Sequence, residues 1–281
     1  MTQLVAVLGT GVVRPGQPVI TADDLGLTRG DGIFDATRVV TDESGRAVVE
    51  HLDRHLSRLA RSAQVVELPA PDLAGLIALV EEALCAWTTP GEAALKIVHT
   101  RGLEHGGVGA TTLVTITETE PGRRRPLAVA SMTRGYASTA FAEAPWLLGG
   151  AKLLSYALHT SARREAARRG ADDALFVSSD GYALEGPTAS LLWVTGSVLH
   201  TTPTGDTGIL ASVTVDLLRE WAAAEDVRFE PELITLDGLH GVTGAWLASS
   251  VRGVCPIASL DGHALQVSAE WADRLASAAG F

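Results

Sequence analysis

Lysine is almost absent from this chain of 281 residues. Of its 22 lysine and arginine residues, only Lys96 and Lys152 are lysines. Arginine cannot replace a primary amine that must lose its proton and attack a carbonyl group, because its guanidinium group stays charged. A lysine amine can do this, and it forms a Schiff base with the carbonyl compound. Composition alone therefore leaves two interpretations of Lys152, a functional amine or a surface lysine that escaped replacement.

Long apolar runs, clustered cysteines and an excess of basic residues are also missing. Although 46% of the residues are hydrophobic, no run approaches the ~18 uninterrupted apolar residues of a membrane-spanning helix. The first residues do not resemble a signal peptide, which predicts a cytoplasmic protein. Cys85 and Cys255 lack metal-site spacing, so we expect free thiols and no bound metal. The net charge of −11 argues against nucleic acid as a partner, because phosphate binding favours a basic surface.

Predicted strands and helices alternate along the chain without an internal repeat. Leucine and alanine residues in segment 51–64 have the spacing of one buried helix face, and Pro71 suits the first turn of a second helix over 71–87. Segment 118–126 is polar and contains two prolines and a glycine, which indicates a linker. We also predict strands at 3–8, 93–100, 112–118, 127–132, 227–231, 244–250 and 253–260, and a loop that passes into a strand within 27–40. Hairpins are predicted at 12–20 (tip at Pro15 and Gly16), 174–186 and 190–201, and helices at 155–170, 212–223 and 268–279.

Three features could together bind one cofactor. They are the amine of Lys152, the carboxylate of Glu185 at the end of a predicted strand, and the glycine-bearing segment 205–214 that leads into a helix. A helix N-terminus binds phosphate well, because its N–H groups are unpaired and its dipole is positive there. Pyridoxal phosphate (PLP) requires a Schiff-base lysine, a partner for its pyridine nitrogen and a phosphate site. Taken alone, each feature also has an ordinary explanation, such as a turn residue or a helix cap.

These residues lie in motifs that resemble the fold-type IV PLP enzymes, also called class IV aminotransferases. The family includes branched-chain and D-amino acid aminotransferases, (R)-amine transaminases and aminodeoxychorismate lyases. GDGIFDATRV at 30–39 is similar to its strand lining the substrate pocket. HLSRLARSA at 55–63 is similar to its helix whose arginine holds the PLP phosphate, which implies this role for Arg58. The remaining motifs imply Lys152 as the Schiff-base lysine (AKLLSYA), Glu185 at the pyridine nitrogen (LEGPTAS), and phosphate binding by Ser212, Val213 and Thr214 (ASVT) and by Ser250 (WLASSVRG).

The resemblance also implies an architecture of mixed α/β (α+β) class. A small N-terminal α/β domain, about 1–119, is joined by a linker at 120–126 to a larger C-terminal domain with a pseudo-barrel, about 127–281. The resemblance places PLP between the two domains, in a pocket completed by a second subunit, so we expect a homodimer.

The resemblance implies two reactions that share one site. In a transaminase, Lys152 acts as the base at the alpha carbon, and the amino group passes from an amino donor to a keto acid acceptor. In aminodeoxychorismate lyase, the same deprotonation releases pyruvate and 4-aminobenzoate. We expect a lowered pKa for Lys152, because its neutral form must be available near neutral pH. A PLP-binding protein without catalysis is a third hypothesis, and the presence of both Lys152 and Glu185 argues against it.

Substrate recognition is less well defined by the sequence. The motif Phe34-Asp35-Ala36 departs from the F-E-G of branched-chain enzymes, which argues against that role. Arg101 and His105 are four residues apart, unlike the R-x-H carboxylate clamp of D-amino acid enzymes. The pattern G-D-G-x-F favours a transaminase acting on D-amino acids or (R)-amines, although the lyase shares it. The candidate substrate-binding residues are Phe34, Arg38, Arg101 and Arg252.

Overall fold

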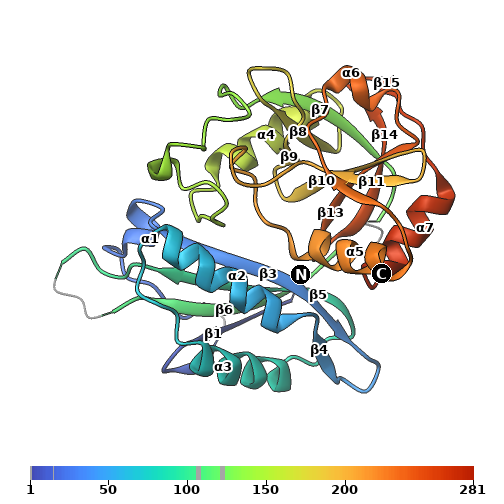
Figure 1. Ribbon diagram of the computed structural model, residues 1–281. Helices are drawn as coiled ribbons and strands as arrows, with labels where there is room; N and C mark the ends of the chain where they lie inside the picture. Colours follow the sequence, from blue (N-terminus) through green and yellow to red (C-terminus); the bar gives the residue numbers. More distant parts are fainter. Residues whose placement is uncertain (1, 15, 106–108, 121–123) are drawn as a thin grey trace. The chain divides into compact units, whose positions relative to one another are not determined.

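The computed structural model describes residues 2–14, 16–105, 109–120 and 124–281 (Figure 1). The chain forms two compact units, Met1–Pro121 with Ala151–Ser155, and Gly122–Gly150 with Tyr156–Phe281. The predicted linker at 120–126 spans the change of unit, and its residues 121–123 lie outside the described ranges. Within these ranges, no helix is long and apolar enough to span a membrane.

Unit 1 is a six-stranded antiparallel sheet in the order β2-β1-β6-β5-β3-β4. Two helices, α2 (Leu52–Val65) and α3 (Leu73–Ala86), share one apolar core with the sheet, to which Leu59, Leu76 and Leu95 contribute. The leucine spacing predicted for the first helix is therefore confirmed. The other elements are β1 (Gln3–Val7), β2 (Gly11–Val13), α1 (Leu25–Thr28), β3 (Gly32–Thr41), β4 (Ala47–Val49), β5 (Gly91–Thr100) and β6 (Thr112–Glu118).

The first hairpin differs from the prediction. Strands β1 and β2 pair with each other, and the chain turns at residues 8–10. Gly9 and Gly11 have φ values of 82° and 84°, a conformation that glycine adopts without steric cost. The predicted hairpin over 12–20 is wrong, because β2 ends at Val13 and residues 16–20 belong to no strand. The position of Pro15 lies outside the described residues.

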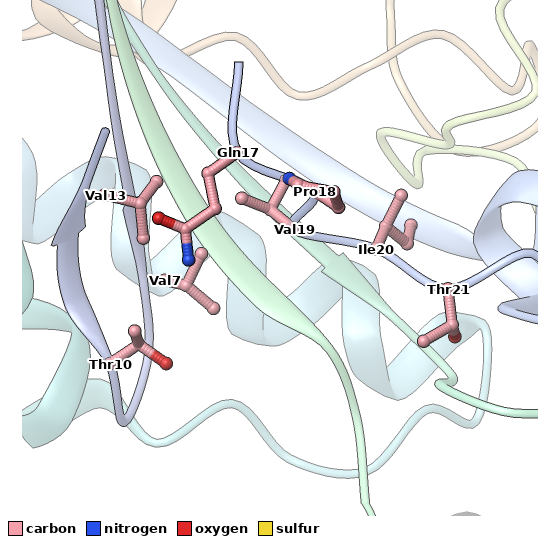
Figure 2. Close-up of a pocket in the computed structure, with 8 residues that line it drawn as sticks. All are labelled: Val7, Thr10, Val13, Gln17, Pro18, Val19, Ile20 and Thr21. Atoms are coloured by element: carbon pink, nitrogen blue, oxygen red, sulfur yellow. The ribbon is translucent and has the colours of Figure 1, made fainter. Parts of the chain in front are cut away.

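Residues 17–21 instead line a small pocket in unit 1 (Figure 2). Val7, Thr10 and Val13 contribute its other side chains. None of these side chains is an acid, a base or a thiol, so the pocket has no group for acid–base or nucleophilic chemistry.

The segment that carries Lys152 belongs to unit 1, whereas the prediction assigned it to the second domain. The backbone N–H of Phe34 in β3 donates to the carbonyl of Lys152 at 2.9 Å, and the N–H of Leu154 donates to the carbonyl of Gly32 at 2.9 Å. Residues 151–155 therefore extend the sheet of unit 1 beside the first half of β3, although chain order places them after the start of unit 2.

Unit 2 contains a mixed nine-stranded sheet with the path β12-β11-β10-β13-β14-β7-β8, and β15 and β9 pair with β14 and β10. One face of the central strands packs Trp193 and Leu247, and the other packs Trp246 beneath α5 and α7. Two units of mixed α/β structure confirm the predicted fold class. The elements are β7 (Leu127–Thr133), η1 (Pro145–Leu147), α4 (Ala157–Arg168), β8 (Asp173–Val177), β9 (Glu185–Gly186), β10 (Ala189–Thr195), β11 (Val198–Thr201), α5 (Val213–Ala224), β12 (Phe229–Pro231), α6 (Leu236–Leu239), β13 (Gly244–Ser249), β14 (Gly253–Leu260), β15 (His263–Ala264) and α7 (Ala269–Ala278).

Candidate functional site

A buried charge cluster joins strand β3 to helix α2 in unit 1. Because strand side chains alternate between faces, Asp35 lies on the face of β3 that also buries Ile33 and Val39. Arg58 of α2 donates to both carboxylate oxygens, from Nε to Oδ2 at 2.8 Å and from Nη2 to Oδ1 at 2.7 Å. His55, one turn earlier on α2, places Nδ1 2.7 Å from Oδ1 of Asp35. This bidentate ion pair with Asp35 fixes the plane of the Arg58 guanidinium group.

The cluster keeps Asp35 ionised. Burial on its own would raise the pKa of Asp35, but the hydrogen bonds from Arg58 and His55 and the positive charge of Arg58 outweigh burial and lower it. Burial lowers the pKa of His55, against the opposing effect of the Asp35 carboxylate. Near neutral pH the cluster therefore consists of a carboxylate, a guanidinium group and a neutral imidazole, so Asp35 compensates the charge of Arg58.

The two lysines of the chain lie beside one aromatic ring. The Nζ atom of Lys152 is 4.8 Å from the ring centroid of Phe34, and that of Lys96 is 5.3 Å from the same centroid. The backbone N–H of Lys152 donates to Oγ of Ser62 on α2 at 3.2 Å. Strand β3 and helix α2, which carry Phe34 and Arg58, therefore also position the Lys152 amine.

The predicted phosphate residues of unit 2 come together at the N-terminus of α5. Ser212 is the N-cap, and its Oγ accepts from the N–H of Val215 at 3.3 Å. The hydroxyl oxygens of Thr214 and Ser250 are 3.1 Å apart, although the two residues lie 36 positions apart in the chain. The N–H groups of Val213 and Thr214 have no hydrogen-bond partner in the described part of the chain. Unpaired N–H groups beside two hydroxyl groups fit a phosphate.

Glu185 is connected to this phosphate segment. It lies in β9, which pairs with β10, and its Oε2 accepts from the N–H of Leu210 at 3.3 Å. Leu210 lies three residues before the start of α5. The backbone that leads into α5 therefore also binds the carboxylate of Glu185. The residues of each unit fit the chemistry of PLP. Unit 1 has an amine and an oriented guanidinium group, and unit 2 has a carboxylate and a helix N-terminus with unpaired N–H groups.

Arg101 is held within unit 1. Its Nε donates to Asp31 Oδ2 at 2.6 Å and its Nη2 to Oδ1 at 3.2 Å, and the guanidinium group also donates to the carbonyls of Val66 and Glu67. The hydrogen bond to Asp31 raises the pKa of Arg101. A substrate carboxylate would have to compete with Asp31, and His105 is exposed. These contacts favour a structural role for Arg101.

Arg38 and Arg252 also have carboxylate partners within their own units. Arg38 Nη1 donates to Glu92 Oε1 at 3.1 Å, and its Nη2 lies 3.9 Å from Glu50. Arg252 Nη1 lies 2.8 Å from Oδ2 of Asp173, a fully buried carboxylate. Both guanidinium groups are thus compensated by protein carboxylates, and the role of either in substrate binding stays a prediction.

Asp35 and His55 are the residues whose role sequence reasoning missed. From the sequence, Asp35 was noted only because it departs from a family motif. His55 was noted only as part of the helix motif. A signal was nevertheless present, because Asp35 is a charged residue in the same strand phase as the apolar Ile33 and Val39. A carboxylate at such a position requires a buried cation, and Arg58 on the following helix supplies it.

Comparisons with known proteins match the chain to one family. The family model for class IV amino-transferases matches residues 32–260. A bifunctional aminodeoxychorismate lyase / D-amino acid transaminase from Mycobacterium tuberculosis is 35% identical over 274 residues, which cover 93% of each chain. Among solved structures, a fold IV-transaminase from Curtobacterium pusillum has a TM-score of 0.90 at 35% identity and covers 99% of this chain and 97% of its own. A hypothetical aminotransferase from M. tuberculosis in its alpha-ketoglutarate and PMP bound form has a TM-score of 0.91 at 35% identity, covering 98% of both chains.

Proposed function

The chain belongs to the class IV aminotransferases, and we propose that it is a PLP-dependent transaminase. Its reaction moves an amino group between a D-amino acid or (R)-amine and a 2-keto acid. The observation that carries this proposal is the match to a D-amino acid transaminase that is also a lyase, over 93% of both chains. A related structure in an alpha-ketoglutarate and PMP bound form supports a keto acid as the second substrate and PLP as the cofactor.

The proposed roles follow from the side chains. When bound, PLP supplies an aldehyde for the lysine and a ring that withdraws electrons from the substrate. The Lys152 amine takes the proton from the substrate's alpha carbon, which requires its neutral form. Glu185 holds a proton at the pyridine nitrogen. Arg58, oriented by Asp35, binds the phosphate together with Ser212, Val213 and Thr214 at the start of α5 and with Ser250, which follows β13.

Aminodeoxychorismate lyase activity is the second candidate function. The same M. tuberculosis relative carries that activity in its name. The residues proposed above serve either reaction, because both begin with removal of a proton by Lys152. In the lyase reaction the substrate would release pyruvate and 4-aminobenzoate.

We also propose that the protein is a cytoplasmic homodimer. The resemblance to the family implies a pocket completed by a second subunit. Cys85 and Cys255 are not joined in a disulfide, which suits a reducing compartment.

A substrate panel tests the proposed function. Purified protein with PLP is incubated with D- and L-amino acids or (R)-amines together with 2-oxoglutarate, and separately with aminodeoxychorismate. Glutamate formed from 2-oxoglutarate in the presence of D-alanine supports the transaminase. Pyruvate released from aminodeoxychorismate, without any glutamate from the D-alanine reaction, would favour the lyase instead. Protein that binds PLP but turns over none of these compounds would contradict both functions, and Lys152→Ala is the inactive control.

A further inference from the structure

Arg134 differs from the arginines considered above for substrate binding, because no carboxylate among the described residues contacts it. It follows β7, where its backbone N–H donates to the carbonyl of Val177 at 2.8 Å. Its Nε donates to the hydroxyl oxygen of Tyr136 at 2.8 Å. Its Cζ lies 5.2 Å from the ring centroid of Tyr136 and 4.7 Å from that of Phe176. The guanidinium group is thus held by two aromatic rings and a neutral hydroxyl.

The charge of Arg134 has no direct carboxylate partner within the described residues. Its Nη1 atom is shielded from solvent and has no hydrogen-bond partner there. A shielded guanidinium nitrogen without an acceptor is unfavourable, because the donor has lost water and gained nothing in return. The planar fork of arginine matches a carboxylate with two parallel hydrogen bonds. Arg252 also has shielded nitrogens without an acceptor in the described part of the chain, Nε and Nη2. Arg134 differs from Arg38, Arg101 and Arg252 in another respect, because each of these three already contacts a protein carboxylate.

The backbone around Arg134 is fixed. The carbonyl of Tyr136 accepts from the N–H of Ser179 at 2.7 Å. Two residues later, Ser138 donates from its N–H and its hydroxyl to the two carboxylate oxygens of Asp180, at 2.9 and 2.7 Å. The ring of Phe141 packs edge-on against Tyr136 with centroids 5.1 Å apart. Arg134 is therefore preorganised, so binding an anion would require little ordering of this segment.

Arg134 also lies near Glu185 within unit 2. Its Cζ lies 4.7 Å from the ring centroid of Phe176, and the carbonyl of Phe176 accepts at 2.8 Å from the N–H of Leu184, the residue before Glu185. Burial raises the pKa of Tyr136, the charge of Glu185 raises it further, and Arg134 opposes both effects. The Tyr136 hydroxyl is therefore protonated at neutral pH and lies within electrostatic range of both Arg134 and Glu185. Glu185, the proposed partner of the pyridine nitrogen, and the guanidinium group of Arg134 therefore lie near each other in unit 2.

We propose that Arg134 binds the carboxylate of the amino acid and keto acid substrates, with Tyr136 and Phe176 holding its guanidinium group in position. This inference rests on the proposed transaminase function and narrows its substrate class to amino acids and keto acids rather than simple amines.

Binding of pyruvate, which has a single carboxylate, tests the assignment without requiring turnover. The dissociation constant is measured by calorimetry on protein loaded with PLP, which has no amino group to transfer to pyruvate, for wild type, Arg134→Ala and Arg134→Lys. A charge-assisted hydrogen bond contributes about 1.5–3 kcal/mol, so Arg134→Ala should weaken pyruvate binding by roughly 10- to 150-fold. Arg134→Lys should recover part of this loss. The control is Arg228→Ala, which removes an exposed arginine paired with Glu230 in the same unit.

A second readout compares D-alanine with D-alaninamide, which lacks the negative charge. In Arg134→Ala, kcat/KM for D-alanine should fall by a similar factor while the value for D-alaninamide stays unchanged. Equal losses for both substrates, or pyruvate binding unaltered in Arg134→Ala, would overturn the inference. Arg134→Gln gives the same comparison if the alanine variant folds poorly. Failure of the proposed function would look different, because wild-type protein would then not transfer an amino group from D-alanine.

Discussion

Replacing Asp35 with asparagine should destabilise unit 1 without changing the shape of the side chain. Asparagine keeps an oxygen to accept from the N–H of Ala36, which donates to Asp35 Oδ1 at 2.7 Å. It removes the charge that compensates Arg58, whose side chain is only 7% exposed. Breaking one partner of a buried ion pair costs about 3–5 kcal/mol, because the other charge is left buried. We therefore expect the free energy of unfolding of unit 1 to fall by that amount.

Hydrogen exchange followed by mass spectrometry assigns the loss to the correct unit. Peptides from β3 and α2 should lose protection in Asp35→Asn, whereas peptides from β10 and β13 in unit 2 provide an internal reference. The matched control is Asp23→Asn, because Asp23 is exposed. Cofactor affinity should also fall, since Arg58 loses the partner that orients it.

A double variant separates the ion pair from other effects. Replacing both Asp35 and Arg58 by leucine removes both charges together, so it should be less destabilising than Asp35→Asn alone. Unchanged hydrogen exchange in β3 and α2 of Asp35→Asn would contradict this prediction. So would a decrease in the free energy of unfolding of unit 1 of less than about 1 kcal/mol.

Three further predictions follow from other residues. Glu185→Gln should leave PLP bound but lower turnover strongly, measured as kcat, and near-normal turnover would contradict its role at the pyridine nitrogen. Thr214→Val should weaken PLP affinity, measured by titration, whereas Thr204→Val, outside α5, serves as the control. Because burial lowers the pKa of His55, the unfolded state takes up its proton first, so stability should fall as pH drops below about 6.5. His55→Gln should remove that share of the pH dependence in urea unfolding, and an unaltered slope would refute the assignment.

Local patterns made much of the fold predictable. The recurrence of Leu52, Leu56 and Leu59 indicated the buried face of α2, because helix periodicity is a local property. The first hairpin could not be read in the same way. Gly9 and Gly11 competed with Pro15 and Gly16 as turn residues, and pairing of β1 with both β2 and β6 decided between them.

The ligand-binding residues were predictable only where a motif carried them. Lys152 and Glu185 occur in segments similar to the family's motifs, so their order along the chain sufficed. Whether a protein carboxylate already pairs with an arginine depends instead on which residues lie across the sheet or in the next loop. Only the fold showed that Asp31 engages Arg101 and that no carboxylate contacts Arg134 within the described residues.

The most direct test of the central proposal identifies the amine that carries PLP. Borohydride reduction fixes the Schiff base, and peptide mass spectrometry then locates the pyridoxyl group. The chain has only two lysines, and their Nζ atoms lie 4.8 and 5.3 Å from the same ring, so the alternatives are sharply defined. We predict that the pyridoxyl group is found on Lys152 and that Lys152→Ala carries none. A label on Lys96, or unlabelled protein after reduction with PLP present, would contradict it.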